Sequence, residues 1–394
     1  MSKGFLAQGS FTTTEKRQNI KMKLGIAGLC LAIFIALLSA FWISRSPPVP
    51  TAIADFKAPF VFGRFSIPED NPLTEEAFQL GRRLFYDPML SGDNSMSCAT
   101  CHQQERAFTD GQPVALGHGG KELAFNSMSL ANLLWGPRRF FWDGRSPTLE
   151  HQALQPLINP DEMQQPLDEL VRELKSAPEY PEMFWKAYGE VSEENVARAL
   201  ATFMRMLISA NSKYDRYLRG ELRLSPQEEH GRKLFMAHPD VKVSLRGGNC
   251  IDCHSQFVTA GFSDGWDGFI NNGLDAEQNL GRGLEAVTGD ILDRGKFKTP
   301  TLRNIAVTGP YMHDGRFATL SEVLTHYNSG IQFSDTLSPL ILEADNTVVD
   351  PIAAHGLGLA PKEVDAIIAF LHTLTDEAFL TEPKFSSPFE EETQ

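Results

Sequence analysis

The sequence contains little cysteine and no excess of basic residues, and each shortage argues against a class of protein. There are five cysteines in 394 residues. Four of them lie in two short motifs and only Cys30 is left over, so we predict no structural disulfide. Lys and Arg number 36 against 50 Asp and Glu, for a net charge of -14. That charge argues against binding to nucleic acid and favours a basic soluble partner.

Long stretches of alternating polar and apolar residues are also missing, so the sequence does not predict an extended β-sheet. Apolar residues at helical spacing instead occupy 195–208 and 361–374. Hydrophobic residues make up 42% of the chain, which is enough for a sizeable core and argues against global disorder. We therefore predict an all-α chain.

One uncharged run, 24–43, is long enough to cross a bilayer as a helix. Only Arg45 follows it closely, whereas four basic residues precede it: Lys16, Arg17, Lys21 and Lys23. This asymmetry places the N-terminus in the cytoplasm and the remainder in the periplasm. A cleaved signal peptide is the alternative, with a small-x-small site at 52–54 that lies beyond several prolines. We favour a retained anchor in the inner membrane.

Two Cys-x-x-Cys-His motifs, at 98–102 and 250–254, indicate covalently attached c-type haem. In such a motif the thiols bond to the porphyrin edge and the neighbouring imidazole ligates the iron. Zinc clusters are the competing interpretation, but they need further Cys or His at ligand spacing. We therefore expect two haem c groups, held by these residues: Cys98, Cys101 and His102 for the first, and Cys250, Cys253 and His254 for the second.

The surroundings of the two motifs repeat in the same order. Gly-Arg-x-Leu-Phe occurs at 81–85 before the first motif and at 231–235 before the second. Trp-Asp-Gly-Arg at 142–145 matches His-Asp-Gly-Arg at 313–316, and Thr-Leu follows each at the same distance. Three matches in one order predict two tandem cytochrome c-like haem domains with long loops. The expected segments are a cytoplasmic tail 1–23, the anchor 24–43, a proline-rich linker 44–68, the first haem domain 69–218, the second 219–385 and a tail 386–394.

The repeat also compares the positions opposite the two proximal histidines. Pro156 lies fourteen residues after Trp142, and Tyr327 lies fourteen residues after His313. A proline side chain carries no ligand atom, whereas a phenolate could close the second iron. The sequence thus predicts an open, reactive first haem and a closed, electron-handling second haem. Two neighbours remain rival ligands of the second iron: His326 and Met312.

An open haem needs acid–base help to cleave a peroxide bond, because a proton has to move between the two oxygens. The segment after Trp142 offers Gln152 and Glu162. A single glutamate is more often a solvated surface charge, so from the residues alone Glu162 is only a candidate.

Four motifs resemble those of the bacterial di-haem cytochrome c peroxidase family, and within it the branch similar to the methylamine-utilisation oxidase MauG. The resemblance covers roughly residues 70–375. The motifs are Phe-Trp-Asp-Gly-Arg at 141–145, Asn-Pro-Asp-Glu-Met at 159–163, Thr-Pro-Thr-Leu-Arg-Asn at 299–304 and Pro-Tyr-Met-His-Asp-Gly at 310–315.

This resemblance implies roles for individual residues. Glu162 would be the acid–base group with Gln152 beside it, and Trp142 would lie between the haems and relay electrons. Other peroxidases of the family close the second haem with methionine and this branch with tyrosine, which favours Tyr327. In some members a loop histidine caps the first haem, and His118 falls near that place without a clean match in spacing. A calcium ion is also implied, with oxygen ligands from Asn126, Thr308 and Pro310.

We expect a periplasmic di-haem peroxidase that reduces hydrogen peroxide with electrons from a small periplasmic cytochrome c or copper protein. The alternative enzyme is a MauG-like oxidase that modifies residues of a partner protein. A non-enzymatic electron carrier is the third possibility. It would require protein ligands to close both irons, and Pro156 argues against that.

Overall fold

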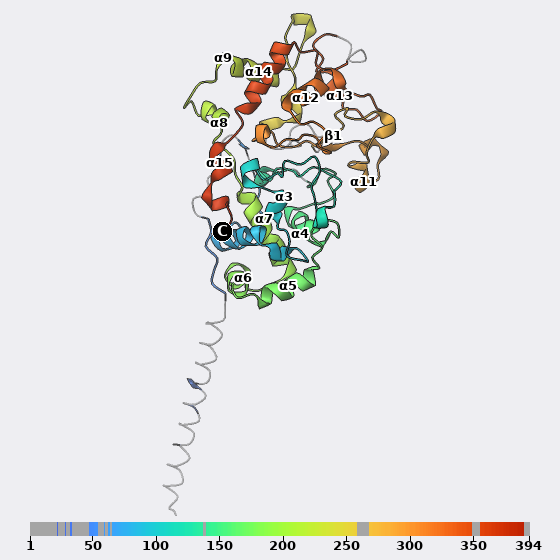
Figure 1. The fold of residues 1–394 in the computed structure, drawn as a ribbon. Coiled ribbons are helices and arrows are strands. Elements are labelled where there is room, and N and C mark those ends of the chain that lie inside the picture. Colours follow the sequence, from blue (N-terminus) through green and yellow to red (C-terminus); the bar gives the residue numbers. More distant parts are fainter. Residues whose placement is uncertain are drawn as a thin grey trace, which may run out of the picture. The chain divides into compact units, whose positions relative to one another are not determined.

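Two packed pairs of helices frame the chain, one pair for each haem motif (Figure 1). In the computed structural model, α2 (Glu75–Tyr86) packs on α7 (Glu193–Met206), and α9 (Pro226–Met236) packs on α14 (Pro361–His372). Helices α7 and α14 confirm the two helical segments expected from spacing. The structure describes residues 22, 28, 32–33, 47–53, 59, 62–63, 65–136, 139–257, 268–348 and 355–389.

Side-chain caps explain where α2 and α9 begin. The Thr74 hydroxyl accepts a hydrogen bond from the Ala77 backbone N–H at 3.3 Å. Ser225 and Glu228 form a capping box, with the serine hydroxyl accepting from the Glu228 N–H at 3.2 Å and the carboxylate accepting from the Ser225 N–H at 2.7 Å. Pro226 occupies the first turn, where no amide donor is needed. Both helix starts are therefore encoded locally.

A glycine at the same motif position lets each helix pair approach closely. A Cβ on Gly81 would lie 2.0 Å from the Ala199 carbonyl oxygen of α7, and one on Gly231 would lie 1.8 Å from the Ala366 carbonyl oxygen of α14. A side chain cannot fit at either point. The need for glycine at two equivalent crossings explains why Gly-Arg-x-Leu-Phe occurs twice.

Shorter elements lie in the segments that connect and follow these four helices. In the described part of the chain after α2, the other α-helices are α3 (Cys98–Cys101), α4 (Leu149–Ile158), α5 (Leu167–Ser176), α6 (Tyr180–Tyr188), α8 (Lys213–Leu218), α10 (Cys250–Cys253), α11 (Glu285–Thr288), α12 (Leu320–Thr325), α13 (Pro339–Leu342) and α15 (Glu377–Thr381). Short helical turns include η5 (Leu133–Trp135), η10 (Ile305–Val307) and η13 (Pro383–Phe385). The segment η11 (His326–Gly330) is a π-helix.

One small sheet departs from the predicted all-α fold. Strands β1 (Phe269–Ile270) and β2 (Phe297–Lys298) are antiparallel, with Phe269 opposite Lys298 and Ile270 opposite Phe297. This is the only sheet in the described part of the chain. Two residues per strand are too few to leave an alternating pattern in the sequence. The chain is otherwise mostly helical, as predicted.

The turn that follows each motif is also built twice. Isolated antiparallel bridges close residues 140–146 and 311–317. Inside each turn an arginine pairs with the aspartate two residues before it, at 2.9 Å in the first copy and 2.7 Å in the second. The two turns therefore hold Trp142 and His313 at matching positions.

Two hydrophobic cores form around the helix pairs. The first buries Phe85 and Phe203, whose ring centroids lie 5.0 Å apart. The second buries Phe235, Phe257 and Phe370, with 5.1 Å between the centroids of Phe235 and Phe257. Each core thus has its own aromatic cluster.

The end of the described chain returns to the first core. Phe379 of α15 and Phe385 are buried there, and Phe379 packs on Phe108 with ring centroids 5.7 Å apart. The Arg82 guanidinium donates to the carbonyl oxygens of Ser386 at 2.6 Å and Pro383 at 2.9 Å. Residues from the expected second domain and tail thus complete the core of the first, and the segment boundaries remain predictions.

The predicted membrane anchor, 24–43, lies almost wholly outside the described residues. Within the residues that are described, no helix is both long and apolar enough to span a bilayer. The chain divides into two units, Met1–Val49 and Pro50–Gln394, and both haem motifs lie in the second. The anchor remains a prediction.

Candidate functional site

The first Cys-x-x-Cys-His motif folds as the single turn α3, and its two thiols and His102 line one cavity. His102 Nδ1 lies 2.8 Å from the Phe108 carbonyl oxygen. Because a carbonyl only accepts, Nδ1 carries the proton and Nε2 the lone pair. Burial lowers the pKa of His102, which keeps the imidazole neutral, as an iron ligand must be.

Three residues predicted to face the first haem meet in this cavity. Gln152 and Pro156 lie on α4, and Glu162 lies in the loop that follows it. Helix α4 begins at Thr148, whose hydroxyl accepts from the His151 N–H at 3.1 Å. The rest of the described wall is mostly apolar and includes Met96, Met163 and Met204, of which only Met163 belongs to a motif noted in the sequence.

The Glu162 carboxyl is held in a setting that suits proton transfer. Burial raises its pKa above the ordinary value, while a 3.2 Å hydrogen bond from Asn159 Nδ2 and the charge of Arg145 act in the opposite direction. Among the described residues, Gln152 Oε1 is buried without a hydrogen-bond partner. A buried carboxyl and an unpartnered amide oxygen at one cavity indicate a site for a polar ligand.

His118 lies beside this cavity but is not among its described lining residues. Its backbone N–H donates to the Glu162 carbonyl oxygen at 2.9 Å, and its Nδ1 lies 3.3 Å from an Asp93 carboxylate oxygen. A Cβ on Gly117 would lie 2.0 Å from the Asp161 carbonyl oxygen. The loop therefore braces the backbone of Glu162, and gating by His118 remains a prediction.

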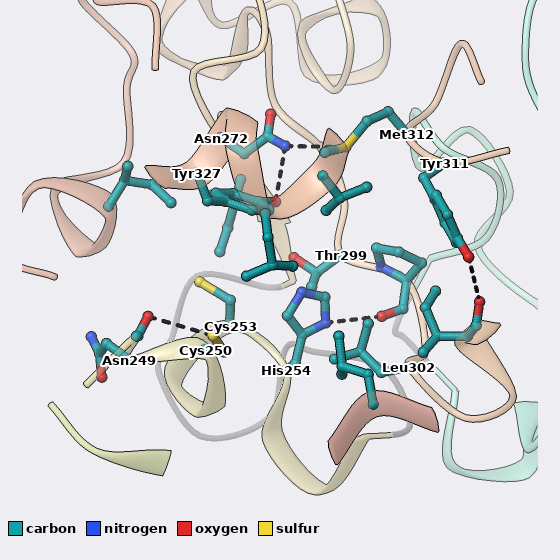
Figure 2. A pocket seen from close by; sticks show the side chains of 18 of the residues that line it. Asn249, Cys250, Cys253, His254, Asn272, Thr299, Leu302, Tyr311, Met312 and Tyr327 are labelled. Atoms are coloured by element: carbon teal, nitrogen blue, oxygen red, sulfur yellow. Dashed lines mark hydrogen bonds between the residues drawn. The ribbon is translucent and has the colours of Figure 1, made fainter. Parts of the chain in front are cut away.

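The second motif repeats the first arrangement at α10 (Figure 2). His254 Nδ1 lies 3.2 Å from the Pro300 carbonyl oxygen, so Nε2 again carries the lone pair. Burial lowers the pKa of His254 to about 4. Cys250, Cys253 and His254 line a largely apolar cavity, and the buried side chain of Asn249 at its wall has no hydrogen-bond partner among the described residues.

Figure 2 shows Tyr327 and Met312 across the second cavity from His254. Asn272 Nδ2 donates to the Tyr327 hydroxyl at 3.1 Å and lies 3.6 Å from the Met312 sulfur. Burial raises the pKa of Tyr327 to about 12. Tyr327 lies in the π-helix η11, a conformation that is frequent at functional sites. Asn272 was missed from sequence, because nothing near it in the chain marks it as a neighbour of Tyr327.

The rival ligand His326 faces elsewhere. Its Nε2 lies 3.2 Å from the Asn272 carbonyl oxygen, and it is not among the described residues of the cavity wall. Neighbouring residues of a helix point in different directions, and here Tyr327 lines the cavity while the His326 ring faces the Asn272 backbone. The geometry favours Tyr327 over His326, and Met312 stays a rival.

Trp142 belongs to the first half of the chain but lines the second cavity. It is 7% exposed, and its Nε1 donates to the Asn126 carbonyl oxygen at 2.9 Å. The next residue, Ser127, donates its hydroxyl to the Cys101 carbonyl oxygen at 2.6 Å. A short path of covalent and hydrogen bonds therefore joins Trp142 to the first motif.

The residues that the family resemblance assigns to calcium lie near Trp142 and His313. The Asn126 N–H donates to the His313 carbonyl oxygen at 2.9 Å, and Thr308 and Pro310 precede His313 in its loop. The described residues contain no cluster of three or more His, Cys, Asp or Glu that could hold a metal. That search does not test a site made of an amide and two carbonyls, so calcium remains a prediction.

The residues present fit two covalently bound haems. Each cavity combines paired thiols, a neutral imidazole of fixed tautomer, apolar walls and a buried polar side chain without a partner. The fold and the two cavities thus define a class of protein, a mostly helical c-type cytochrome. Its two haem sites are lined by different side chains.

Comparison with known proteins gives the family. The family profile described as di-haem cytochrome c peroxidase matches residues 75–223. The chain is 37% identical over 322 residues to the methylamine utilization protein MauG of Methylorubrum extorquens, which covers 80% of this chain and 83% of that protein. It is 31% identical over 320 residues to cytochrome c551 peroxidase of Nitrosomonas europaea, covering 80% and 84%.

A solved structure agrees with these relatives. The crystal structure of a MauG-like protein associated with microbial copper homeostasis superposes with a TM-score of 0.74 and 35% identity, covering 85% of this chain and 99% of that one. The chain belongs to the di-haem cytochrome c peroxidase family and is an oxidoreductase. Membership of this family implies two c-type haems.

Proposed function

We propose that the protein reduces hydrogen peroxide to water with electrons from a small redox partner. The observation that carries the proposal is the first cavity, which Glu162, Gln152 and Pro156 line together. In the sequence repeat Pro156 corresponds to Tyr327, which lines the second cavity. Cys98, Cys101 and His102 would hold a haem at this cavity, and its iron would supply the redox chemistry for peroxide reduction.

Glu162 moves the proton that the reaction requires. Hydrogen peroxide takes up two electrons and two protons and gives two waters. The carboxylate accepts a proton from one peroxide oxygen and returns it to the other, so that water leaves instead of hydroxide. Asn159 orients the carboxylate through its 3.2 Å hydrogen bond, and the unpartnered oxygen of Gln152 accepts from a peroxide O–H.

Trp142 carries electrons between the two sites. Its ring lines the second cavity, and its indole N–H begins the bonded path through Asn126 and Ser127 to Cys101. Electrons from the donor would enter at the second site, whose cavity Tyr327 lines, and would leave at the first. The net charge of -14 favours a basic donor, such as a small cytochrome c or copper protein.

A MauG-like oxidation of a partner protein is the second candidate. Tyr327 at the second cavity and the 37% identity to a protein named methylamine utilization protein MauG support it. Trp142 would then carry electrons in the opposite sense, from the partner protein inward. Nothing in the first cavity distinguishes the two reactions, because both need the same proton transfer at Glu162.

A non-enzymatic electron carrier is the third candidate, and the three methionines of the first cavity favour it. A thioether from Met96, Met163 or Met204 could close the first iron as methionine does in cytochromes c. The buried carboxyl of Glu162 argues against this role, because a carrier has no use for an ionisable group there. For all three candidates we propose a periplasmic location, since the run 24–43 would export the body of the protein.

Electron paramagnetic resonance of the oxidised protein distinguishes the candidates. One high-spin and one low-spin iron, together with steady turnover of peroxide by a reduced basic cytochrome c, support the peroxidase. Two low-spin irons and no turnover support the carrier, whereas reaction with peroxide but slow turnover of every small donor supports the oxidase. Tyr327→Phe should alter the low-spin signal. Tyr311→Phe is its control, because Tyr311 lines the same cavity but its hydroxyl donates to the Ile305 carbonyl oxygen at 2.9 Å.

A further inference from the structure

Lys298 is a buried cation at the wall of the second cavity. It is 5% exposed, and its backbone N–H donates to the Trp142 carbonyl oxygen at 2.8 Å. The backbone of Lys298 is also fixed by the pairing of β2 with β1, in which it lies opposite Phe269. The strand therefore holds Lys298 in place beside Trp142.

The described residues offer this ammonium no ion-pair partner. No carboxylate among them lies within 4.0 Å of Lys298, and the one whose charge it feels, Asp143, is already paired with Arg145 at 2.9 Å. Burial lowers the pKa of Lys298 to about 8, while the charge of Asp143 acts in the opposite direction. The side chain is still mostly cationic at neutral pH. A buried charge without a partner is costly, so an anion that enters this cavity would be stabilised there.

The chemistry of the cavity identifies that anion. Its described wall is apolar apart from a few neutral polar groups, and Lys298 is the one lysine or arginine in it. Haem c is joined to its thiols at one edge and carries two propionate carboxylates at the opposite edge. Cys250 and Cys253 hold the first edge, whereas Lys298 belongs to the part of the wall next to Trp142.

We propose that the Lys298 ammonium binds a propionate carboxylate of the haem attached at Cys250 and Cys253. This inference rests on the haem assignment of the proposed function. The ion pair fixes the haem edge next to Trp142 and places a positive charge beside the iron that receives electrons from the donor. A neighbouring cation favours the reduced form, because reduction removes one positive charge from the iron.

Redox titration of the holoprotein tests the proposal. In Lys298→Met, the ratio of reduced to oxidised second haem at a fixed potential should fall at least tenfold, which corresponds to about 59 mV for one electron. Lys298→Arg, which keeps the charge, should stay near the wild type. Lys296→Met is the matched control, because Lys296 precedes β2 by one residue and its Nζ pairs with Asp293 at 3.0 Å instead.

The possible outcomes separate this inference from its premise. Mass spectrometry of each variant counts the attached haems, so a wild-type chain with fewer than two would overturn the haem assignment itself. If Lys298→Met titrates like the wild type and Lys296→Met, the ion pair is absent and the proposal fails. Loss of the second haem in Lys298→Met but not in Lys298→Arg supports a charge requirement. Loss in both variants shows a packing role and overturns the proposal.

Discussion

At the scale of single residues, Glu162 combines a chemical role with a cost to stability. Because burial raises its pKa, the folded chain binds the proton more tightly than the unfolded chain does. Stability therefore falls as the pH rises from the ordinary glutamate pKa to the raised value. Glu162→Gln removes this cost, so at pH 7 the variant should be at least as stable as the wild type in urea unfolding. Its peroxide turnover should drop by about 10²–10⁴-fold.

Turnover of the wild type should itself decrease as the pH falls through the raised pKa of Glu162, because only the carboxylate accepts a proton. Asp161→Asn is the matched control: Asp161 is the neighbouring carboxylate, but it lies near the surface and pairs with Lys121. That variant should keep the activity and the pH profile of the wild type. An active Glu162→Gln, or an equal loss in both variants, would remove Glu162 from the mechanism.

The residues of the site divide into those that the sequence could predict and those that it could not. Pro156 and Tyr327 were predictable as residues of the two cavity walls, because equal spacing from two similar turns implies corresponding positions. The same fourteen-residue spacing ends at Tyr327 and not at its neighbour His326, so the repeat also favours Tyr327. Asn272 and Lys298 were not predictable. Their positions depend on loops that fold back across the cavity, and no local pattern records such a contact.

At the scale of elements, the two helix crossings depend on a missing side chain. Gly→Ala inside a helix usually stabilises a protein by about 0.5–1 kcal/mol. At Gly81 and Gly231 the new Cβ would meet a carbonyl oxygen at 2.0 and 1.8 Å, so each substitution should instead destabilise by about 1–3 kcal/mol or more. Urea unfolding followed at the haem absorbance measures the change. Gln79→Ala, on the exposed face of α2, should stay within about 0.5 kcal/mol.

If Gly81→Ala or Gly231→Ala matched the stability of Gln79→Ala, the close helix approach described for these pairs would be wrong.

The length of an element explains how well the sequence predicted it. Long helices such as α7 and α14 have apolar spacing over three or more turns, and that signal is local. Strands β1 and β2 exist only because two distant segments meet, so neither segment alone contains enough information to predict them.

At the scale of the whole molecule, the first hydrophobic core depends on residues from the end of the chain. Phe379 is 3% exposed and lies in the first core, although its helix α15 falls within the expected second domain. Phe379→Ala should therefore destabilise the first domain by about 3–5 kcal/mol. Glu377→Ala changes an exposed residue of the same helix and should have an effect of about 0.5 kcal/mol or less.

Thermal unfolding followed separately at the two haems measures this coupling. In Phe379→Ala the high-spin signal should be lost at a lower temperature than in the wild type, while Glu377→Ala melts normally. A shift confined to the second haem would contradict the packing described for α15. This coupling could not be predicted from the sequence. The repeat indicates two separate domains, and nothing in it shows that residues near the end of the chain pack into the first core.

The return of residues 376–389 also sets an order of events in the life of the molecule. A ribosome makes the chain from its N-terminus, so the segment that holds Cys98 and Cys101 emerges nearly three hundred residues before Phe379 and Phe385 do. Until those two rings arrive, the first core lacks part of its hydrophobic filling. The first core, which packs against Cys98 and Cys101, can therefore be completed only after the end of the chain has been made.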